Sequence, residues 1–200
     1  MAGGFIFCEW DSVQKEYPDF QRAFAELEGK VIEKCTNDWF PKKTPEEAFG
    51  GLTPEPGQFG RTSILPRLFK GFNDAELPHW RQNITATGHQ LILAGVRSGN
   101  VIPEDFKVAW IGLAFPNTEL TITELKWQIS GDKFIRLNIE ELMTYEKPAI
   151  IFEEGYILNE EEAFELYGYV ESTGYQRIVM LGSAYYRVID KVLGDCGSPI

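Results

Sequence analysis

Large apolar residues recur at alternating spacings of four and three near the start of the chain. They are Val13, Tyr17, Phe20, Phe24, Leu27 and Val31. This spacing places their side chains on one face of a helix. Because Pro18 is tolerated in a first helical turn, the pattern predicts a helix over about residues 18–36. The apolar face requires a partner, which is either the chain's own sheet or a neighbouring subunit.

Residues 41–60 are rich in proline and glycine, which predicts a loop or linker after the helix. Thr44, followed by Pro-Glu-Glu, predicts one capped helical turn inside this segment. Loops of this length are usually functional or wrap a neighbouring molecule. We therefore divide the chain into residues 1–60, an N-terminal helix with a Pro/Gly-rich arm, and residues 61–200, a β-sandwich domain.

Residues 3–10 predict a strand or an arm. From about residue 79 the chain contains short runs of β-branched and aromatic residues separated by turn residues. Strands are predicted over residues 80–86, 90–96, 106–115, 120–129, 135–139, 148–153, 163–171 and 175–189.

Several local signals refine these strands. Ser130-Gly131-Asp132 predicts a hairpin turn. A one-residue slip in the apolar alternation of residues 120–129 predicts a bulge near Thr123 or Glu124. Gly182 is expected to kink the long final strand.

Many short strands with few helices between them favour antiparallel architecture. The predicted fold class is mainly β: an antiparallel β-sandwich, jelly-roll-like or Greek-key, with an N-terminal α-helix or arm. Residues 148–188 contain a Glu-Gly loop, the run Phe-Glu-Leu-Tyr-Gly-Tyr and a hairpin into a long aromatic strand. This pattern resembles the closing strands of jelly-roll sandwiches, an architecture found in many virion and particle-building proteins. The resemblance concerns the architecture and does not by itself assign a function.

Composition narrows the class of protein. Hydrophobic residues make up 44% of the chain and charged residues 24%, as in soluble globular domains. The net charge of −11 repels a phosphate backbone, so we expect no nucleic-acid partner. The longest apolar run, residues 108–115, is too short to span a bilayer. The first ten residues have no signal-peptide pattern, which predicts intracellular synthesis and is compatible with incorporation into a particle.

Motifs for catalysis or cofactors are weak. Cys8, Cys35 and Cys196 are too widely spaced for a zinc knuckle or a disulfide framework. No glycine-rich phosphate loop precedes a helix, so a nucleotide cofactor is not expected. His79 and His89 are the two histidines, and no Gly-x-Ser-x-Gly elbow accompanies them. The sequence therefore predicts no cofactor, no metal and no enzyme.

Two acidic runs carry an alternative interpretation. Glu153-Glu154 and residues 160–162, three consecutive glutamates, are most simply solvated surface. Cation binding and glycoside hydrolysis are the alternatives. Adjacent residues on a strand point to opposite faces, so Glu153 and Glu154 are not expected to face each other.

Tyrosines define a second candidate surface. Alternation along residues 164–170 places Phe164, Leu166 and Val170 on one face and Tyr167 and Tyr169 on the other. We expect Tyr185 of the final strand to join these two tyrosines. Such a face is covered by the chain itself, forms a protein interface, or stacks against sugars.

The favoured function is a non-enzymatic structural or assembly protein that forms homo-oligomers, with a virion or particle shell as one setting. The alternative is a β-sandwich module that binds carbohydrate or another small ligand, and an acidic hydrolase ranks third. The predicted interface residues come from the helix stripe and the tyrosine face. They are Phe20, Phe24, Leu27, Val31, Tyr167, Tyr169 and Tyr185.

Overall fold

The computed structural model describes residues 4–12, 19–51, 55–116, 120–133 and 136–189. Its helices are α2 (Asp19–Trp39) and α3 (Pro45–Phe49). Its strands are β1 (Phe5–Glu9), β2 (Phe59–Ser63), β3 (Phe69–Lys70), β4 (Arg81–Ile84), β5 (Gly88–Gly95), β6 (Phe106–Ala114), β7 (Ile122–Ile129), β8 (Asp132–Lys133), β9 (Leu137–Asn138), β10 (Pro148–Leu158), β11 (Phe164–Val170), β12 (Gly174–Arg177) and β13 (Val179–Arg187). Short 3-10 turns complete the described part: η1 (Trp10–Ser12), η2 (Pro66–Leu68) and η3 (Glu140–Thr144).

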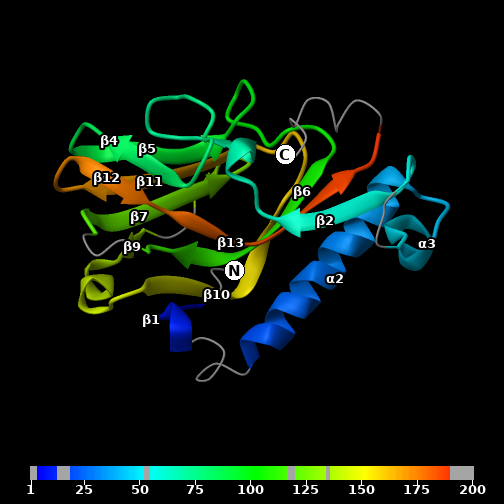
Figure 1. Ribbon diagram of the computed structural model, residues 1–200, viewed down its shortest axis with the longest axis horizontal. Helices are drawn as coiled ribbons and strands as arrows, with labels where there is room; N and C mark the ends of the chain where they lie inside the picture. The colour runs from blue at the N-terminus through cyan, green and yellow to red at the C-terminus, as the bar shows by residue number, and fades with distance from the viewer. Residues whose placement is uncertain (1–3, 13–18, 52–54, 117–119, 134–135, 190–200) are drawn as a thin grey trace.

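The strands form two main antiparallel sheets (Figure 1). Sheet A has the order β1-β10-β6-β13-β2, and sheet B has the order β3-β5-β11-β7-β8, with β9 also paired to β7. Strands β12 and β4 form a separate two-stranded ribbon. From β5 to β7, and again from β10 to β13, the long strands alternate between the two sheets. The predicted antiparallel, mainly β fold with an N-terminal helix is confirmed, while its jelly-roll or Greek-key connectivity stays a prediction.

The main core lies between the facing sides of the two sheets. Trp110 of β6 is fully buried there, and four aromatic rings surround it, among them Tyr156 at a centroid distance of 5.5 Å. The Trp110 ring centroid lies 4.8 Å from that of Phe152, 5.3 Å from Phe164 and 5.7 Å from Trp127. Edge-to-face aromatic pairs add to the free energy of burial, so this cluster stabilises the contact between the two sheets.

Helix α2 forms a third layer on the outer face of sheet A. It contacts β10, β6 and β13 (Figure 1), and it ends at Trp39, three residues beyond the predicted end at 36. Its buried positions include Leu27, Val31, Cys35 and Trp39, which extend the predicted stripe at a spacing of four. Two further members of the predicted stripe, at positions 13 and 17, lie outside the described residues.

Local turn chemistry follows the sequence closely. Thr44 caps α3 in a capping box with Glu47, as the Thr-Pro-Glu-Glu run predicts. Ser130 and Gly131 both have positive φ, 51° and 83°, and join β7 to β8 in a two-residue loop. Positive φ at both loop residues is the signature of a type I′ hairpin turn, so the predicted hairpin is confirmed.

Both predicted strand irregularities are present. Between the pairs Tyr169–Glu124 and Val170–Ile122, the register shifts and leaves Thr123 as the extra residue of a bulge. A second shift lies between positions 181 and 182 of β13. A Cβ on Gly182 would stand 1.9 Å from the carbonyl oxygen of residue 109, so only glycine permits this close approach.

Other boundaries differ from the prediction. The expected strand at 175–189 is divided into β12 and β13 at the buried residue Ile178. Strand β10 continues to Leu158 because Gly155, with a φ of +67°, accommodates a register shift within it. Strands β2 and β3 lie in segments where no strand is predicted. No helix among the described residues is long and apolar enough to cross a membrane.

Candidate functional site

The packing of α2 determines which of the predicted interface residues on this helix are accessible. Leu27 and Val31 are buried against the chain's own sheet, together with Ala109, Ile111 and Tyr185. Leu27 is 3% exposed and Val31 0%, so neither side chain is accessible to another subunit. The helix stripe therefore packs on its own sheet from Leu27 onward, the first of the two partners considered for it.

Tyr185 does not join the other two tyrosines, and this expectation was wrong. It lies on β13 of sheet A, beneath α2, whereas Tyr167 and Tyr169 lie on β11 of sheet B. Alternation along one strand predicts its faces, but it does not predict which sheet contains the strand. Tyr185 is 0% exposed, which removes it from any accessible surface of the protomer.

One polar cluster fastens the middle of α2 to sheet A. The Tyr185 hydroxyl donates to Oε1 of Glu28 at 3.1 Å. Arg61 of β2 binds the same oxygen through Nε and Nη2, each at 2.7 Å. Burial lowers the pKa of Arg61, but its bonds to Glu28 outweigh burial and raise the pKa above its ordinary value. The cluster fixes the rotation of α2 on the sheet.

A second cluster fastens the end of α2. Lys107 of β6 is 1% exposed, and its Nζ lies 2.8 Å from Asp38 and 3.1 Å from Glu160. The Trp39 indole N–H donates to Glu160 at 2.9 Å, and the Asp105 backbone N–H donates to the same carboxylate at 3.0 Å. This network joins the helix, sheet A and the loop between β10 and β11.

The pKa values of this network follow from its bonds. Burial lowers the pKa of Lys107, but hydrogen bonds to Asp38 and Glu160 outweigh it and raise the pKa above its ordinary value. Burial raises the pKa of Glu160, but bonds from Trp39, Lys107 and the Asp105 N–H outweigh it and lower the pKa. Both groups are therefore held in their charged forms, as a bonded ion pair requires.

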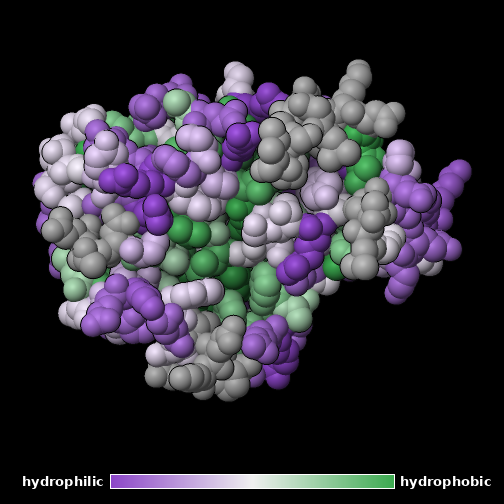
Figure 2. Space-filling model, viewed as in Figure 1, coloured by the Kyte–Doolittle hydropathy of each residue, from purple (hydrophilic) through white to green (hydrophobic). Residues whose placement is uncertain are grey.

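An apolar groove remains open beside the start of α2. It has a volume of about 530 Å³ and is bordered by Phe20, Phe24, Trp10, Val179 and Leu181, among others. Figure 2 shows apolar surface gathered in a hollow over β13, beside α2. Trp10 is 41% exposed and the two phenylalanines are half-buried. Of the predicted helix residues, Phe20 and Phe24 thus lie at an accessible apolar surface.

The outer face of sheet B carries Tyr167 and Tyr169, as predicted. They border a shallow groove of about 270 Å³ with His89, Glu124, Lys126, Gln128 and Arg136. Tyr169 is 41% exposed, and the His89 ring meets its edge with centroids 5.1 Å apart. Glu124 lies 3.7 Å from the guanidinium of Arg136, and the Nζ atom of Lys126 lies 5.9 Å from the centroid of the Tyr167 ring.

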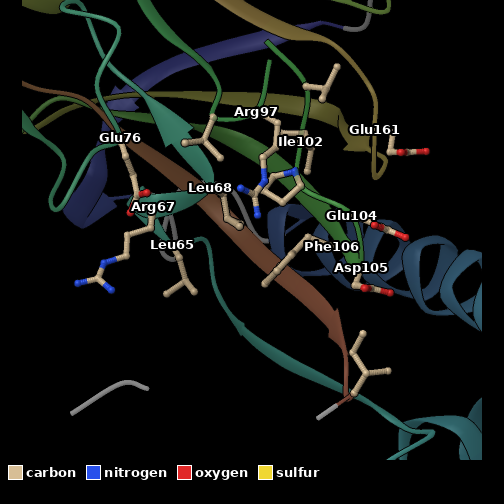
Figure 3. Close-up of a pocket in the computed structure, with 14 residues that line it drawn as sticks. Leu65, Arg67, Leu68, Glu76, Arg97, Ile102, Glu104, Asp105, Phe106 and Glu161 are labelled. Carbon is tan, nitrogen blue, oxygen red and sulfur yellow. The ribbon is translucent and has the colours of Figure 1, made fainter. Parts of the chain in front are cut away.

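A third cavity, of about 490 Å³, lies at one end of the sandwich. Figure 3 shows Glu104, Asp105 and Glu161 on one side of it and Arg67 on the other, with apolar residues such as Leu68 between them. The Asp105 carboxylate is paired with Arg187 at 3.3 Å. Burial raises the pKa of Asp105 above its ordinary value despite this partner.

The predicted acidic runs have structural roles in part. Glu160 belongs to the Lys107 network, and Glu162 accepts bonds from Ser130 Oγ at 2.6 Å and from the Asn159 N–H at 2.8 Å. Glu153 and Glu154 are exposed on β10. Among the described residues no group of three or more His, Cys, Asp or Glu side chains is arranged to hold a metal ion.

Sequence reasoning missed Lys107, although the sequence contains a signal for it. Residues 106–115 are otherwise apolar, and a single lysine in a buried strand requires a partner. Trp10 was included only as the end of a predicted strand or arm, and no pattern placed it near Phe20.

Comparison with protein-family models, with curated proteins and with solved structures finds no match to this chain.

Proposed function

We propose that this chain is a non-enzymatic structural subunit that assembles with further copies of itself. The observation that carries the proposal is the open apolar groove bordered by Trp10, Phe20, Phe24 and Leu181. Large apolar patches rimmed by polar residues mark interaction sites on soluble proteins. Aromatic anchors of this size are also the side chains that contribute most to interface energies.

The occupant of the groove that we propose is a second copy of the chain. An isologous contact uses the same surface on both copies, and this surface combines a hollow with the exposed Trp10 at its border. Arg61 is the charged residue among the described groove-lining residues, and Glu28 already pairs with it. A partner that covers the groove therefore buries no unpaired charge.

The strand order supports this scaffold role. The alternation of long strands between sheets A and B favours a connectivity of the jelly-roll type, which is used by capsid and lectin domains. A virion or particle shell is the setting we favour. Because each copy carries a charge of −11, self-association should strengthen as salt screens the long-range repulsion.

The native mass of the full chain tests the proposal. Light scattering at several salt concentrations should show dimers or larger assemblies, and Phe24→Asp should dissociate them by placing a charge in the groove. Ala25→Asp is the matched control, since it adds the same charge at an exposed position of the same helix. If the protein stays monomeric up to about 100 µM, its free energy of self-association is weaker than about 5.5 kcal/mol. The proposal would then be wrong.

A second candidate function rests on sheet B. Tyr167 and Tyr169 lie beside the Glu124–Arg136 ion pair and the amide of Gln128, a combination that suits a hydroxyl-rich ligand such as a glycan. Calorimetric titration with a glycan panel should then detect binding that Tyr169→Ala abolishes. Tyr175→Ala is the control, because Tyr175 is 56% exposed but lies on the separate ribbon of β12 and β4.

A further inference from the structure

The described strands at the sheet edges differ in length and polarity. At the edges of sheet B, β3, β8 and β9 have two residues each. At one edge of sheet A, β2 exposes Arg61 among small and polar residues. At the other edge, β1 has five residues with the sequence Phe-Ile-Phe-Cys-Glu. Short strands and charged residues protect natural edges from pairing with other chains, and β1 has neither protection over its first four positions.

The hydrogen bonds at both ends of β1 show which backbone groups face outward. The Glu153 N–H donates to the carbonyl of Gly4 at 2.9 Å, and the Trp10 N–H donates to the carbonyl of Lys147 at 2.9 Å. In an antiparallel pair every second residue exchanges hydrogen bonds with its partner strand. Positions 6 and 8 therefore bond to β10, whereas positions 5, 7 and 9 direct their N–H and carbonyl groups away from it.

The partner strand supports the same assignment. Glu9 lies opposite Pro148, which has no N–H to donate, as expected for a pair that exchanges no hydrogen bonds. The 3-10 turn η1 begins directly after Glu9, so the Glu9 carbonyl accepts the first i→i+3 bond of that turn. Strand β1 thus directs the N–H groups of Phe5, Phe7 and Glu9 and the carbonyls of Phe5 and Phe7 outward at an apolar edge (Figure 1).

We propose that β1 pairs antiparallel with β1 of a second copy, about a two-fold axis at Phe7, so that the two A sheets become one continuous sheet. This inference rests on the proposed function and names its contact. In this register Phe7 lies opposite the partner's Phe7, and Phe5 lies opposite the partner's Glu9. The Phe7 N–H then meets the carbonyl of the partner's Phe7, and the Glu9 N–H meets the carbonyl of the partner's Phe5. Each bond is made twice, which gives four hydrogen bonds.

The two-fold register pairs all five residues of β1 with the same five residues of a second copy, which favours that copy as the partner. A shift of two residues in either direction leaves two residues of each strand beyond the end of its partner. The Glu9 carboxylate is already held by the backbone N–H groups of Glu146 and Lys147, at 2.5 and 2.9 Å. Trp10, which follows β1 directly, also borders the apolar groove.

Disulfide trapping tests the register. Position 6 should lie opposite the partner's Cys8 in a pair without hydrogen bonds, whose Cα atoms are about 4.5 Å apart and within disulfide range. Ile6→Cys, with Cys196→Ser to remove a side reaction, should form a covalent dimer under mild oxidation, and peptide mapping should link positions 6 and 8. Adding Cys8→Ser should abolish the link.

Proline substitution tests the hydrogen bonds. Phe7→Pro removes an N–H that the protomer itself does not use, and so it should preserve the fold while weakening the dimer. Phe7→Ala is the matched control, since it removes the same ring and keeps the N–H. Two bonds are lost per dimer, so Phe7→Pro should bind about 30-fold more weakly than Phe7→Ala.

The outcomes separate the two proposals. An assembled wild type without a link between positions 6 and 8, or with equal affinities for the two Phe7 variants, overturns the β1 pairing and leaves self-assembly intact. A wild type that is monomeric overturns both. Circular dichroism of each variant confirms that the protomer remains folded.

Discussion

The Lys107 network yields the sharpest prediction for stability. Lys107→Met retains the length and apolar stem of the side chain but removes the cation between Asp38 and Glu160. The lysine side chain is 2% exposed, against 24% for Glu160 and 43% for Asp38. The substitution therefore leaves two carboxylates near each other, one of them mostly buried.

The magnitude follows from these exposures. Removing one partner of a fully buried ion pair costs about 3–5 kcal/mol of unfolding free energy. Water reaches both carboxylates here, so we expect about 2–3 kcal/mol for Lys107→Met. For a chain of this size, this cost lowers Tm by about 5–10 °C. Asp38→Asn should cost less than about 1 kcal/mol because Asp38 is the more exposed partner.

Urea unfolding followed by tryptophan fluorescence measures the cost. Trp39 is a local probe, since Lys107 Nζ lies 5.2 Å from its ring centroid. Combining Lys107→Met with Glu160→Gln should cost less than the sum of the single variants, because they remove the same interaction. A Lys107→Met protein within about 0.5 kcal/mol of wild type, a difference typical of plain surface substitutions, would refute this reasoning.

Acid provides an independent check of the same pair. The pKa of Glu160 is lowered in the folded protein, so its contribution to stability is complete above the ordinary carboxyl value of 4.5. The contribution decreases as pH falls through the folded pKa. The difference in unfolding free energy between wild type and Lys107→Met should therefore be greatest near neutral pH and should shrink in acid. A difference that is constant from neutral to acidic pH would exclude the ion pair as its source.

Three further predictions concern glycine and cysteine positions. Gly182→Ala should cost more than about 3 kcal/mol in urea unfolding, because its Cβ would collide with a backbone carbonyl at 1.9 Å; a cost below about 1 kcal/mol would contradict this geometry. Gly29→Ala, on an exposed helix position with nothing within 4 Å, should stabilise by about 1 kcal/mol in the same assay, and any loss would contradict it. Burial raises the pKa of the Cys35 thiol to about 12, so thiol reagents at pH 8 should label Cys35 only after unfolding, as peptide mapping would show.

Local features of this chain were predictable because they depend on neighbouring residues. The capping box at Thr44, the type I′ turn at Ser130 and the bulge at Thr123 each involve a few consecutive positions whose backbone preferences are specific. The helix stripe was predictable for the same reason, since its spacing is a property of one element. Strands β2 and β3 were missed because neither shows the apolar alternation that marks a strand; their pairing partners determine them.

The candidate surfaces depended on contacts that the linear pattern does not contain. The sequence predicted the strand that contains Tyr185 but not the sheet to which this strand belongs. Tyr185 was therefore assigned to the tyrosine face, although its strand lies in the other sheet. Lys107 meets Glu160 across 53 residues, and Trp39 meets Glu160 across 121. The sequence by itself determined which elements form and which of their faces are apolar, because side-chain periodicity is local. Only the tertiary structure decided which apolar faces are covered, since coverage depends on the packing of elements far apart in the chain. Among the described residues, that packing leaves the groove beside α2 uncovered and places β1 at an edge of sheet A.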